Sequence, residues 1–188
     1  MGGYSDVEYK FKKIGKNVVI GKNVYFRYPE ATEIGDNVII DEFCYFTTTT
    51  ILGSYIHIGP HCSVVGGIQS RFVMENFSGM SAGCRIACAS DDYVDGGATN
   101  PTIPKALRAH VNVGSVILRK FSTLGTNVVV HPDVEIGVGS VVGSMSLVTK
   151  PLDSWGVYVG IPAKYVKPRP SEFILLHKKK FNKLVGIV

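Results

Sequence analysis

An apolar residue recurs at every sixth position along most of this chain, and this period constrains the fold more than any other feature. It runs in four stretches between Ile14 and Val142. All 17 marked positions are apolar, although a hydrophobic content of 45% would make only about eight of them so. They are Ile14, Ile20, Phe26, Ile34, Ile40, Phe46, Leu52, Ile58, Val64, Met74, Met80, Ile86, Leu118, Leu124, Val130, Ile136 and Val142. A fixed period of this kind predicts a repeat architecture.

A second regularity accompanies the first. The residue four positions after each mark is small or aliphatic everywhere except at Glu30, and glycine often follows the mark directly, where a sharp corner needs a residue without Cβ. Three of the four cysteines, Cys44, Cys62 and Cys84, fall on the small position, and no CxxC pair is present. We therefore expect reduced cysteines that pack in a core, with no role in zinc binding or catalysis.

Runs such as Ile14-Gly15-Lys16-Asn17-Val18 and Ile136-Gly137-Val138-Gly139-Ser140 resemble the hexapeptide repeat of left-handed parallel β-helix acyltransferases. The resemblance covers residues 14–165. It implies an all-β fold in which each hexapeptide forms one side of a triangular prism and three make a coil, so 17 repeats give between five and six coils. We expect an acyltransferase domain over residues 1–165 and a C-terminal tail with a short helix over 166–188.

The period is interrupted three times, and interruptions of a solenoid map to loops on one face. Two are short, near 29–33 and 66–72, and the third is a long loop over about 92–117 that is the expected carrier of function. The C-terminal helix should place Phe173, Leu176 and Leu184 on one apolar stripe that caps the prism or packs on its side.

Composition narrows the function classes. Charged residues make up 19% of the chain, too few for disorder, and no apolar run approaches the roughly 20 residues of a membrane span. The start of the chain lacks the apolar core of a signal peptide, so we expect a cytoplasmic protein without membrane insertion. The net charge of +5 is concentrated near the C-terminus and suits an anionic partner, but no nucleic-acid-binding motif is present, so nucleic acid is not expected as a partner.

The segment Gly160-Ile161-Pro162-Ala163-Lys164 resembles the tail that follows the last coil in hexapeptide acetyltransferases. In that family the tail lies along the coenzyme A groove. The resemblance implies acetyl-CoA as co-substrate, with the phosphates near Lys150 and Lys164. The candidate coenzyme-binding residues are Ser144, Lys150, Gly160, Pro162, Ala163 and Lys164.

Acyl transfer to a hydroxyl needs a general base, and histidine is the natural choice. Galactoside and maltose acetyltransferases place it in a Thr-His-Pro stretch, where this chain has Ser90-Asp91-Asp92. His57 is our candidate instead, at a corner position that points outward. His61 in mid-strand and His131 in a regular turn are expected to be structural or solvated. His110 closes the long loop and could swing into a site, whereas His177 is not expected to take part.

Asp91 and Asp92 stand at the entrance of the long loop, where adjacent carboxylates are costly to bury unless something uses them. One could orient the histidine and the other could bind the sugar, together with Tyr93 and Asn100. Turn formation by Asx side chains is the alternative explanation. The repeat count puts His57 and Asp91 on different edges of one prism, so they would meet only across a subunit boundary. Trimers of the resembling family place their sites there.

We therefore expect a homotrimeric, acetyl-CoA-dependent acetyltransferase acting on a sugar hydroxyl in lipopolysaccharide, O-antigen or capsule synthesis. Exposed aromatic residues such as Tyr45, Tyr55 and Phe72 should mark the interface. The alternative is an N-acetyltransferase acting on a nucleotide-linked amino sugar. A γ-carbonic-anhydrase-like metal enzyme and a non-catalytic scaffold of the same fold are weaker alternatives, and no metal is expected.

Overall fold

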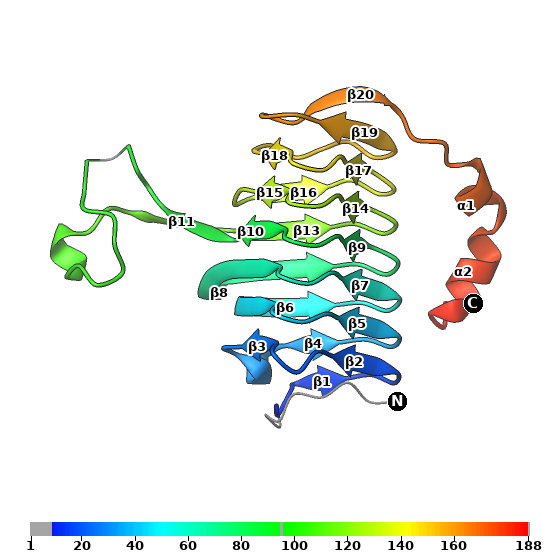
Figure 1. Ribbon diagram of the computed structural model, residues 1–188, viewed down its shortest axis with the longest axis horizontal. Coiled ribbons are helices and arrows are strands. Elements are labelled where there is room, and N and C mark those ends of the chain that lie inside the picture. The colour runs from blue at the N-terminus through cyan, green and yellow to red at the C-terminus, as the bar shows by residue number, and fades with distance from the viewer. Residues whose placement is uncertain (1–8, 95, 188) are drawn as a thin grey trace.

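The computed structural model describes residues 9–94 and 96–187, and the eight N-terminal residues on which the expectation about signal peptides rests lie outside them. The chain winds into a three-sided β-solenoid of the left-handed type, with parallel strands stacked coil on coil (Figure 1). The predicted all-β fold is confirmed. Among the described residues, no helix is long and apolar enough to cross a membrane.

Strand pairing defines three faces of the prism, here called the first, second and third face. The first face contains β2 (Val18–Ile20), β5 (Val38–Ile40), β7 (Ile56–Ile58), β9 (Gly79–Met80), β14 (Thr123–Leu124), β17 (Val141–Val142) and β19 (Gly156–Val159). The second contains β3 (Tyr25–Phe26), the starts of β6 (Tyr45–Leu52) and β8 (Ser63–Met74), β10 (Arg85–Ala87), β15 (Val129–Val130) and β18 (Leu147–Val148). The third contains β1 (Lys13–Ile14), β4 (Glu33–Ile34), the ends of β6 and β8, β13 (Ser115–Leu118) and β16 (Val134–Ile136).

The solenoid has about seven turns, more than the five to six predicted. The 17 counted marks end at Val142, but the coils continue through Val148, six residues further on. Val148 lies on the second face, Leu152 forms an isolated bridge with Ile136 on the third, and Tyr158 lies on the first. The last turn was not counted because Leu152, its residue on the third face, follows Val148 after only four residues instead of six.

The marked residues form the core. Nearly all of them are less than 5% exposed, because successive marks point inward from successive faces. The cysteines follow them inside. The Sγ atoms of Cys44 and Cys62 lie 3.2 Å from the carbonyl oxygens of Gly59 and Ser81, and Cys84 reaches that of Gly125 at the same distance. Burial also raises the pKa of the Cys88 thiol to about 12, so this sulfur stays protonated.

All three interruptions fall at one edge of the prism, between the second and third faces. The first holds the short helix η1 (Pro29–Ala31), and the second lies within the long strand β8. The third is a projecting hairpin of β11 (Ala89–Asp91) and β12 (Val111–Val113), with η2 (Lys105–Leu107) near its tip (Figure 1). The excursion therefore spans about 89–114 and not 92–117, because β13 already lies in the prism and Val116 is fully buried.

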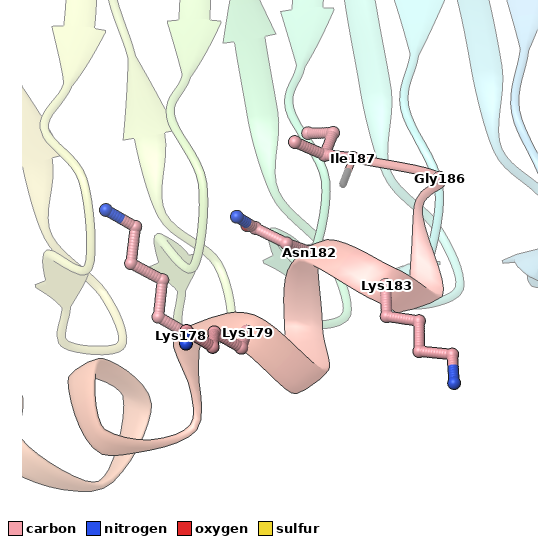
Figure 2. Close-up of a pocket in the computed structure, with 6 residues that line it drawn as sticks. All are labelled: Lys178, Lys179, Asn182, Lys183, Gly186 and Ile187. Atoms are coloured by element: carbon pink, nitrogen blue, oxygen red, sulfur yellow. The ribbon is translucent and has the colours of Figure 1, made fainter.

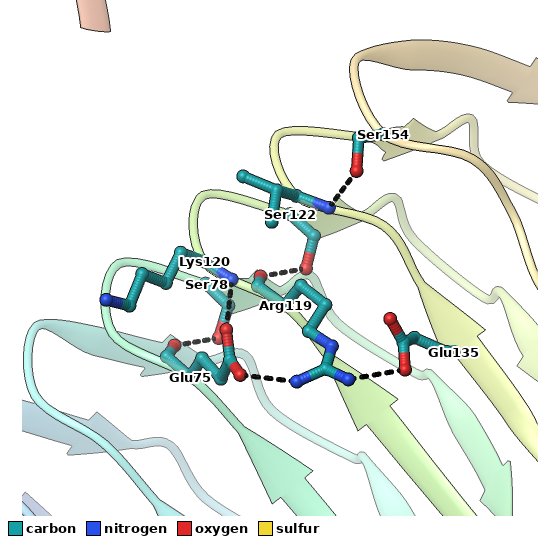
Figure 3. A network of polar contacts seen from close by, with 8 residues as sticks. Glu75, Ser78, Arg119, Lys120, Ser122, Glu135 and Ser154 are labelled. Carbon is teal, nitrogen blue, oxygen red and sulfur yellow. Dashed lines mark hydrogen bonds and ion pairs between the residues drawn. The ribbon is translucent and has the colours of Figure 1, made fainter. Parts of the chain in front are cut away.

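An ion-pair network links successive coils at the end of the third face (Figure 3). Arg119 donates from Nη1 to Glu75 at 2.8 Å and from Nη2 to Glu135 at 2.7 Å. The backbone N–H of Lys120 donates to the other Glu75 oxygen at 3.0 Å. Since Glu75 follows β8 and Glu135 lies in β16, one guanidinium ties together three successive coils. Its hydrogen bond lowers the pKa of the Glu135 carboxyl.

Aromatic residues stack along a corner of the prism. Phe77 and Phe121 both have positive φ, as sharp corners require, and their rings lie 5.0 Å apart and nearly parallel. Tyr55 stacks below them and is only partly exposed. Phe72, expected on an exposed side, is fully buried on the third face, so it cannot contribute to an interface. Tyr45 is 38% exposed, as expected of a surface aromatic.

The C-terminal segment is a strand followed by two short helices. β20 (Lys164–Pro168) pairs antiparallel with β19 and covers the end of the prism, and it contains the predicted boundary between residues 165 and 166. α1 (Glu172–Leu176) and α2 (Lys178–Leu184) then run down the side (Figure 1). The predicted side packing is confirmed.

The face of these helices that packs was predicted wrongly. Phe181 contacts Phe77 and Phe121 edge-on, whereas Phe173, Leu176 and Leu184 are 69%, 81% and 53% exposed. The backbone leaves helical geometry at His177, between α1 and α2. The apolar stripe was predicted for one continuous helix, so the break at His177 turns its residues away from the prism.

Candidate active site

A cleft of about 560 Å³ opens where the hairpin leaves the prism. We call it the acidic cleft. The second face supplies one wall, and β11 with the residues that follow it supplies the other. The lining residues are Ala87, Ser90, Asp91, Asp92, Tyr93, Val94, Asn112, Val129, His131, Pro132, Asp133 and Thr149. Three predicted site residues, Asp91, Asp92 and Tyr93, are thus brought together.

The two carboxylates differ in their surroundings. Asp92 accepts a hydrogen bond from the backbone N–H of Val94 at 3.0 Å, which is the Asx turn considered as the alternative explanation. Asp91 ends β11, and no side chain of the described residues hydrogen-bonds or pairs with its carboxylate. Asp91 is therefore available to bind a positively charged or proton-donating group in the cleft.

His131 was missed as a candidate. It lines the acidic cleft, and its backbone N–H donates to the carbonyl of Val148 at 2.9 Å. The register pairs Ile86 with Val130, which places His131 beside Ala87 at the base of the hairpin. Assigning each hexapeptide to a face across the insertion would have indicated that His131 lies beside Ala87. The Val-His-Pro sequence by itself does not distinguish this corner from the other corners of the repeat.

His57 lies elsewhere. It is in the middle of β7 on the first face, whereas His61 is the corner residue, with φ of 62°, so the two positions were predicted the wrong way round. His57 Nε2 lies 2.8 Å from Asp41 Oδ2. Asp41, and neither Asp91 nor Asp92, is therefore the carboxylate that orients this ring within one chain.

A cavity of about 300 Å³ beside His57 is lined also by Gly59, Pro60, Gly79, Met80, Ser81, Ala82 and Thr123. We call it the His57 cavity. It shares no residue with the acidic cleft. In one chain, His57 and Asp91 do not meet.

The tail segment folds back against β18. Leu147 donates its N–H to the carbonyl of Gly160 at 3.0 Å, and Ala163 donates to that of Leu147 at 2.7 Å. Gly160 has φ of 105°, which suits glycine, and the Ile161–Pro162 peptide is cis. These turns create a cavity of about 220 Å³, here called the tail cavity, lined by Val148, Thr149, Lys150, Leu152, Pro162 and Ala163. Thr149 also borders the acidic cleft, so the two are adjacent.

The other predicted site residues are more distant. Ser144 lies at the corner after β17 and lines none of these three cavities. Lys164 begins β20 and is exposed. Asn100 accepts hydrogen bonds from the N–H and hydroxyl of Thr102 and so holds a turn in the outer hairpin, outside the acidic cleft.

A larger cavity, about 750 Å³, lies at α2 and is lined by Lys178, Lys179, Asn182, Lys183, Gly186 and Ile187 (Figure 2). Its lining has no carboxylate, histidine, serine or cysteine, so we do not place the chemistry there. Within the described part of the chain, histidine, cysteine and carboxylate side chains nowhere gather in threes that could hold a metal ion.

The fold and the site can now be compared with known proteins. No protein-family model matches the chain. AntD, an N-acyltransferase from Bacillus cereus solved with dTDP-4-amino-4,6-dideoxyglucose and coenzyme A, is 34% identical, with a TM-score of 0.86 over 92% of this chain and 91% of AntD. The chain belongs to the hexapeptide-repeat acyltransferases.

One further relative agrees with this membership, and one more distant structure shares the fold. An Escherichia coli dTDP-4-amino-4,6-dideoxy-D-glucose acyltransferase is 29% identical over 90% of this chain and 88% of its own length. A hexapeptide-repeat acetyltransferase of Vibrio cholerae, 17% identical over 85% of this chain and 75% of its own, has a TM-score of 0.56 and supports the fold alone. The predicted acyltransferase activity is confirmed, and the coenzyme A expected from the tail is a ligand in the AntD complexes.

Proposed function

We propose that this protein transfers an acyl group from acyl-CoA to the amino group of a nucleotide-linked 4-amino-4,6-dideoxy sugar. The two proteins that it resembles over about nine tenths of their length are acyltransferases, one named for such a sugar and one solved with it bound. Both favour an amine as acceptor over the polysaccharide hydroxyl that the sequence first suggested. The structural observation that carries the proposal is the unpaired Asp91 carboxylate in the acidic cleft.

An amine acceptor explains why a carboxylate stands where related enzymes have histidine. A sugar amine is largely protonated near neutral pH, so it must be bound as a cation and then lose a proton. Asp91 can do both, because its carboxylate has no competing side-chain partner in the described chain. Asp92 is engaged by the backbone of Val94 and so is the weaker candidate.

A spacing shared with AntD supports Asp91. The solved AntD structures include variants of one serine and of one aspartate ten positions further along. In this chain only one serine has an aspartate ten positions after it, and the pair is Ser81 and Asp91. Ser81 lines the His57 cavity, and Asp91 lines the acidic cleft.

The reaction balances without a further reactant. Asp91 takes one proton from the ammonium group, and the nitrogen then attacks the thioester carbonyl carbon. Backbone N–H groups are suited to stabilise the resulting oxyanion. When the tetrahedral species collapses, the C–S bond breaks, the amide remains on the sugar, and the thiolate takes the second amine proton to leave as coenzyme A thiol.

The donor would lie along the tail cavity. Its phosphates require cations, and Lys150 lines the cavity while Lys164 follows it on β20. Pro162 and Ala163 offer an apolar wall for the pantetheine arm. Thr149 links the tail cavity to the acidic cleft, so a donor held there can present its thioester to an acceptor held by Asp91.

The site would be completed by a second copy of the chain. His57 and Ser81 line a cavity on the first face that does not reach the acidic cleft of the same chain. In a threefold homotrimer, the first face of one prism can lie against the hairpin edge of the next. The His57 cavity and the acidic cleft would then form one active site, in which Asp41 orients His57 towards the acceptor.

The direct test is acetyl transfer to dTDP-4-amino-4,6-dideoxyglucose, followed by thiol release and by the mass of the amide product. The matched control is dTDP-6-deoxyglucose, which differs only in having a hydroxyl in place of the amine at carbon 4. We expect acylation of the amine and none of the control. Acylation of the hydroxyl sugar with no reaction of the amine would overturn the proposal and restore the O-transfer hypothesis.

A further inference from the structure

The second face below the acidic cleft has an unusual composition. The register of its strands aligns Tyr25, Tyr45, Ser63, Arg85, Val129 and Leu147 in one outward column. Val129 belongs to the acidic cleft, so the column leads directly away from it towards the N-terminal coils. No carboxylate is present in the strands of this face. The column therefore offers two aromatic rings and one positive charge, with no negative charge among its residues.

The aromatic end of the column is a stacked pair of tyrosines. Tyr25 and Tyr45 are 44% and 38% exposed, and their rings stack 5.1 Å apart with an angle of 15°. Arg27 donates from Nη2 to the hydroxyl of Tyr45 at 3.2 Å, which fixes that ring. The next residue up the column is Ser63, whose side chain is much smaller than a ring, and Tyr45 is 38% exposed.

Arg85 stands between the rings and the cleft. Its Nη1 donates to the carbonyl oxygens of His61, Gly83 and Cys84 at the neighbouring corner, so the guanidinium is anchored at one nitrogen. A second arginine nitrogen remains for a ligand, since a guanidinium has five donors. No carboxylate pairs with Arg85 among the described residues, so its charge is not neutralised within the chain.

We propose that this column is the subsite for the nucleoside diphosphate of the acceptor, with the base on Tyr45 and the diphosphate on Arg85. Strands of a sheet are about 4.8 Å apart, so Arg85 lies about 5 Å and Tyr45 about 14 Å below Val129. The order of sugar site, cation and aromatic ring matches the order of sugar, diphosphate and base in a nucleotide sugar. Bases stack on aromatic rings, and guanidinium groups bind phosphate oxygens in pairs.

This inference rests on the proposed function, because the acidic cleft, as the sugar site, decides which end of the column receives the sugar and which the base. The test uses the full-length protein with dTDP-4-amino-4,6-dideoxyglucose as acceptor and dTDP as inhibitor and calorimetric ligand. Tyr45→Ala should raise the acceptor KM and the Kd of dTDP about tenfold, whereas Tyr45→Phe, which keeps the ring, should stay within about twofold. Arg85→Gln should weaken both by about tenfold or more. Turnover at saturation and the KM for acetyl-CoA should not change.

Three results separate the possible failures. If the wild-type enzyme acylates the nucleotide sugar while the Tyr45→Ala and Arg85→Gln variants have unchanged KM and dTDP affinity, the subsite is wrong and the proposed function stands. If dTDP binds and both variants lose it but no sugar amine is acylated, the subsite is supported and the proposed function fails. If Tyr45→Ala instead lowers the molar mass in light scattering, the patch is an interface between copies and the inference is overturned.

Discussion

At the scale of single residues, the acidic cleft separates two adjacent carboxylates that look equivalent in the sequence. Asp92 is used by the backbone of its own turn, and Asp91 is not. The difference arises because β11 ends at Asp91, so that Asp91 still follows strand geometry while Asp92 begins the turn. Only the position relative to the end of the strand decides which carboxylate is available for chemistry.

Asp91→Asn should therefore lower the turnover of the amino-sugar acylation by about 10² to 10⁴, because the amide cannot take the amine proton. Asp92→Asn is the matched control and should cost less than about tenfold. Steady-state kinetics with acetyl-CoA and dTDP-4-amino-4,6-dideoxyglucose measure both. Equal losses in the two variants would show that the pair acts as one acidic patch and that the assignment to Asp91 is wrong.

Lys150 and Lys164 test the donor site at the same scale. Replacing either by Ala should raise the KM for acetyl-CoA about tenfold with little change in turnover, because the lost interaction with phosphate is the same in the ground and transition states. Lys179→Ala, on the exposed side of α2, is a control of equal charge change. An unchanged KM in both Lys150→Ala and Lys164→Ala would move the coenzyme away from the tail cavity.

At the scale of elements, the network around Arg119 connects the coils on either side of the hairpin insertion (Figure 3). The Glu135 pKa is lowered by Arg119, so the ionised carboxylate is the form that the fold prefers. This contribution is present above the unfolded-state pKa of about 4.3 and is lost as the pH falls through the lower value of the folded state.

Arg119→Ala should accordingly lower the thermal midpoint at pH 7 by about 2–4 °C, since partly exposed ion pairs contribute only about 1 kcal/mol together. The difference between variant and wild type should shrink as the pH falls below the unfolded-state value of about 4.3, and it should vanish once Glu135 is protonated in the folded wild type as well. Thermal unfolding followed by circular dichroism across this range gives the answer. A difference that is constant with pH would mean that Arg119 stabilises through packing and not through charge.

The C-terminal helices give a second prediction for elements. Phe181 docks edge-on against Phe77 and Phe121, while Leu176 is 81% exposed. Phe181→Ala should increase trypsin cleavage at the lysines of α2 about tenfold, because losing part of one aromatic contact costs about 1.4 kcal/mol of local stability. Leu176→Ala should leave the cleavage rate unchanged. Equal effects would place the docking face on the side predicted from the sequence.

At the scale of the whole molecule, the six-residue period predicted a repeat architecture, because every inward position repeats the same steric demand, and the resemblance to hexapeptide-repeat acyltransferases implied the prism. The hairpin of β11 and β12 could not be predicted in this way, since its pairing of Ala89 with Val113 lies outside the period. His131 was expected to be structural or solvated for a related reason: it becomes a neighbour of Asp91 only through a register that crosses the insertion. The face that α2 turns towards the prism depends on a break in the helix at His177, and no proline or glycine at this position predicts such a break.

The oligomeric state determines whether the acidic cleft of one chain and the His57 cavity of another can form one active site. Light scattering should give about three times the chain mass of 20.4 kDa, as a threefold trimer requires. Asp91→Asn alters the acidic cleft, and the double variant His57→Ala with Ser81→Ala alters the His57 cavity. If each site combines the acidic cleft of one copy with the His57 cavity of the next, both variants should be impaired alone. A trimer containing both kinds of chain should regain unaltered sites.

Random mixing in equal amounts by co-expression should restore about a quarter of the wild-type sites, because an unaltered site needs the right variant on each side of one boundary. Turnover of the purified mixed trimers, compared with each parent at equal concentration, measures this recovery. Co-expressing two copies of each parent and purifying them in the same way controls for the procedure itself. Mixed trimers with no more activity than the average of their parents would place the whole site within one chain and remove the role of the neighbouring first face.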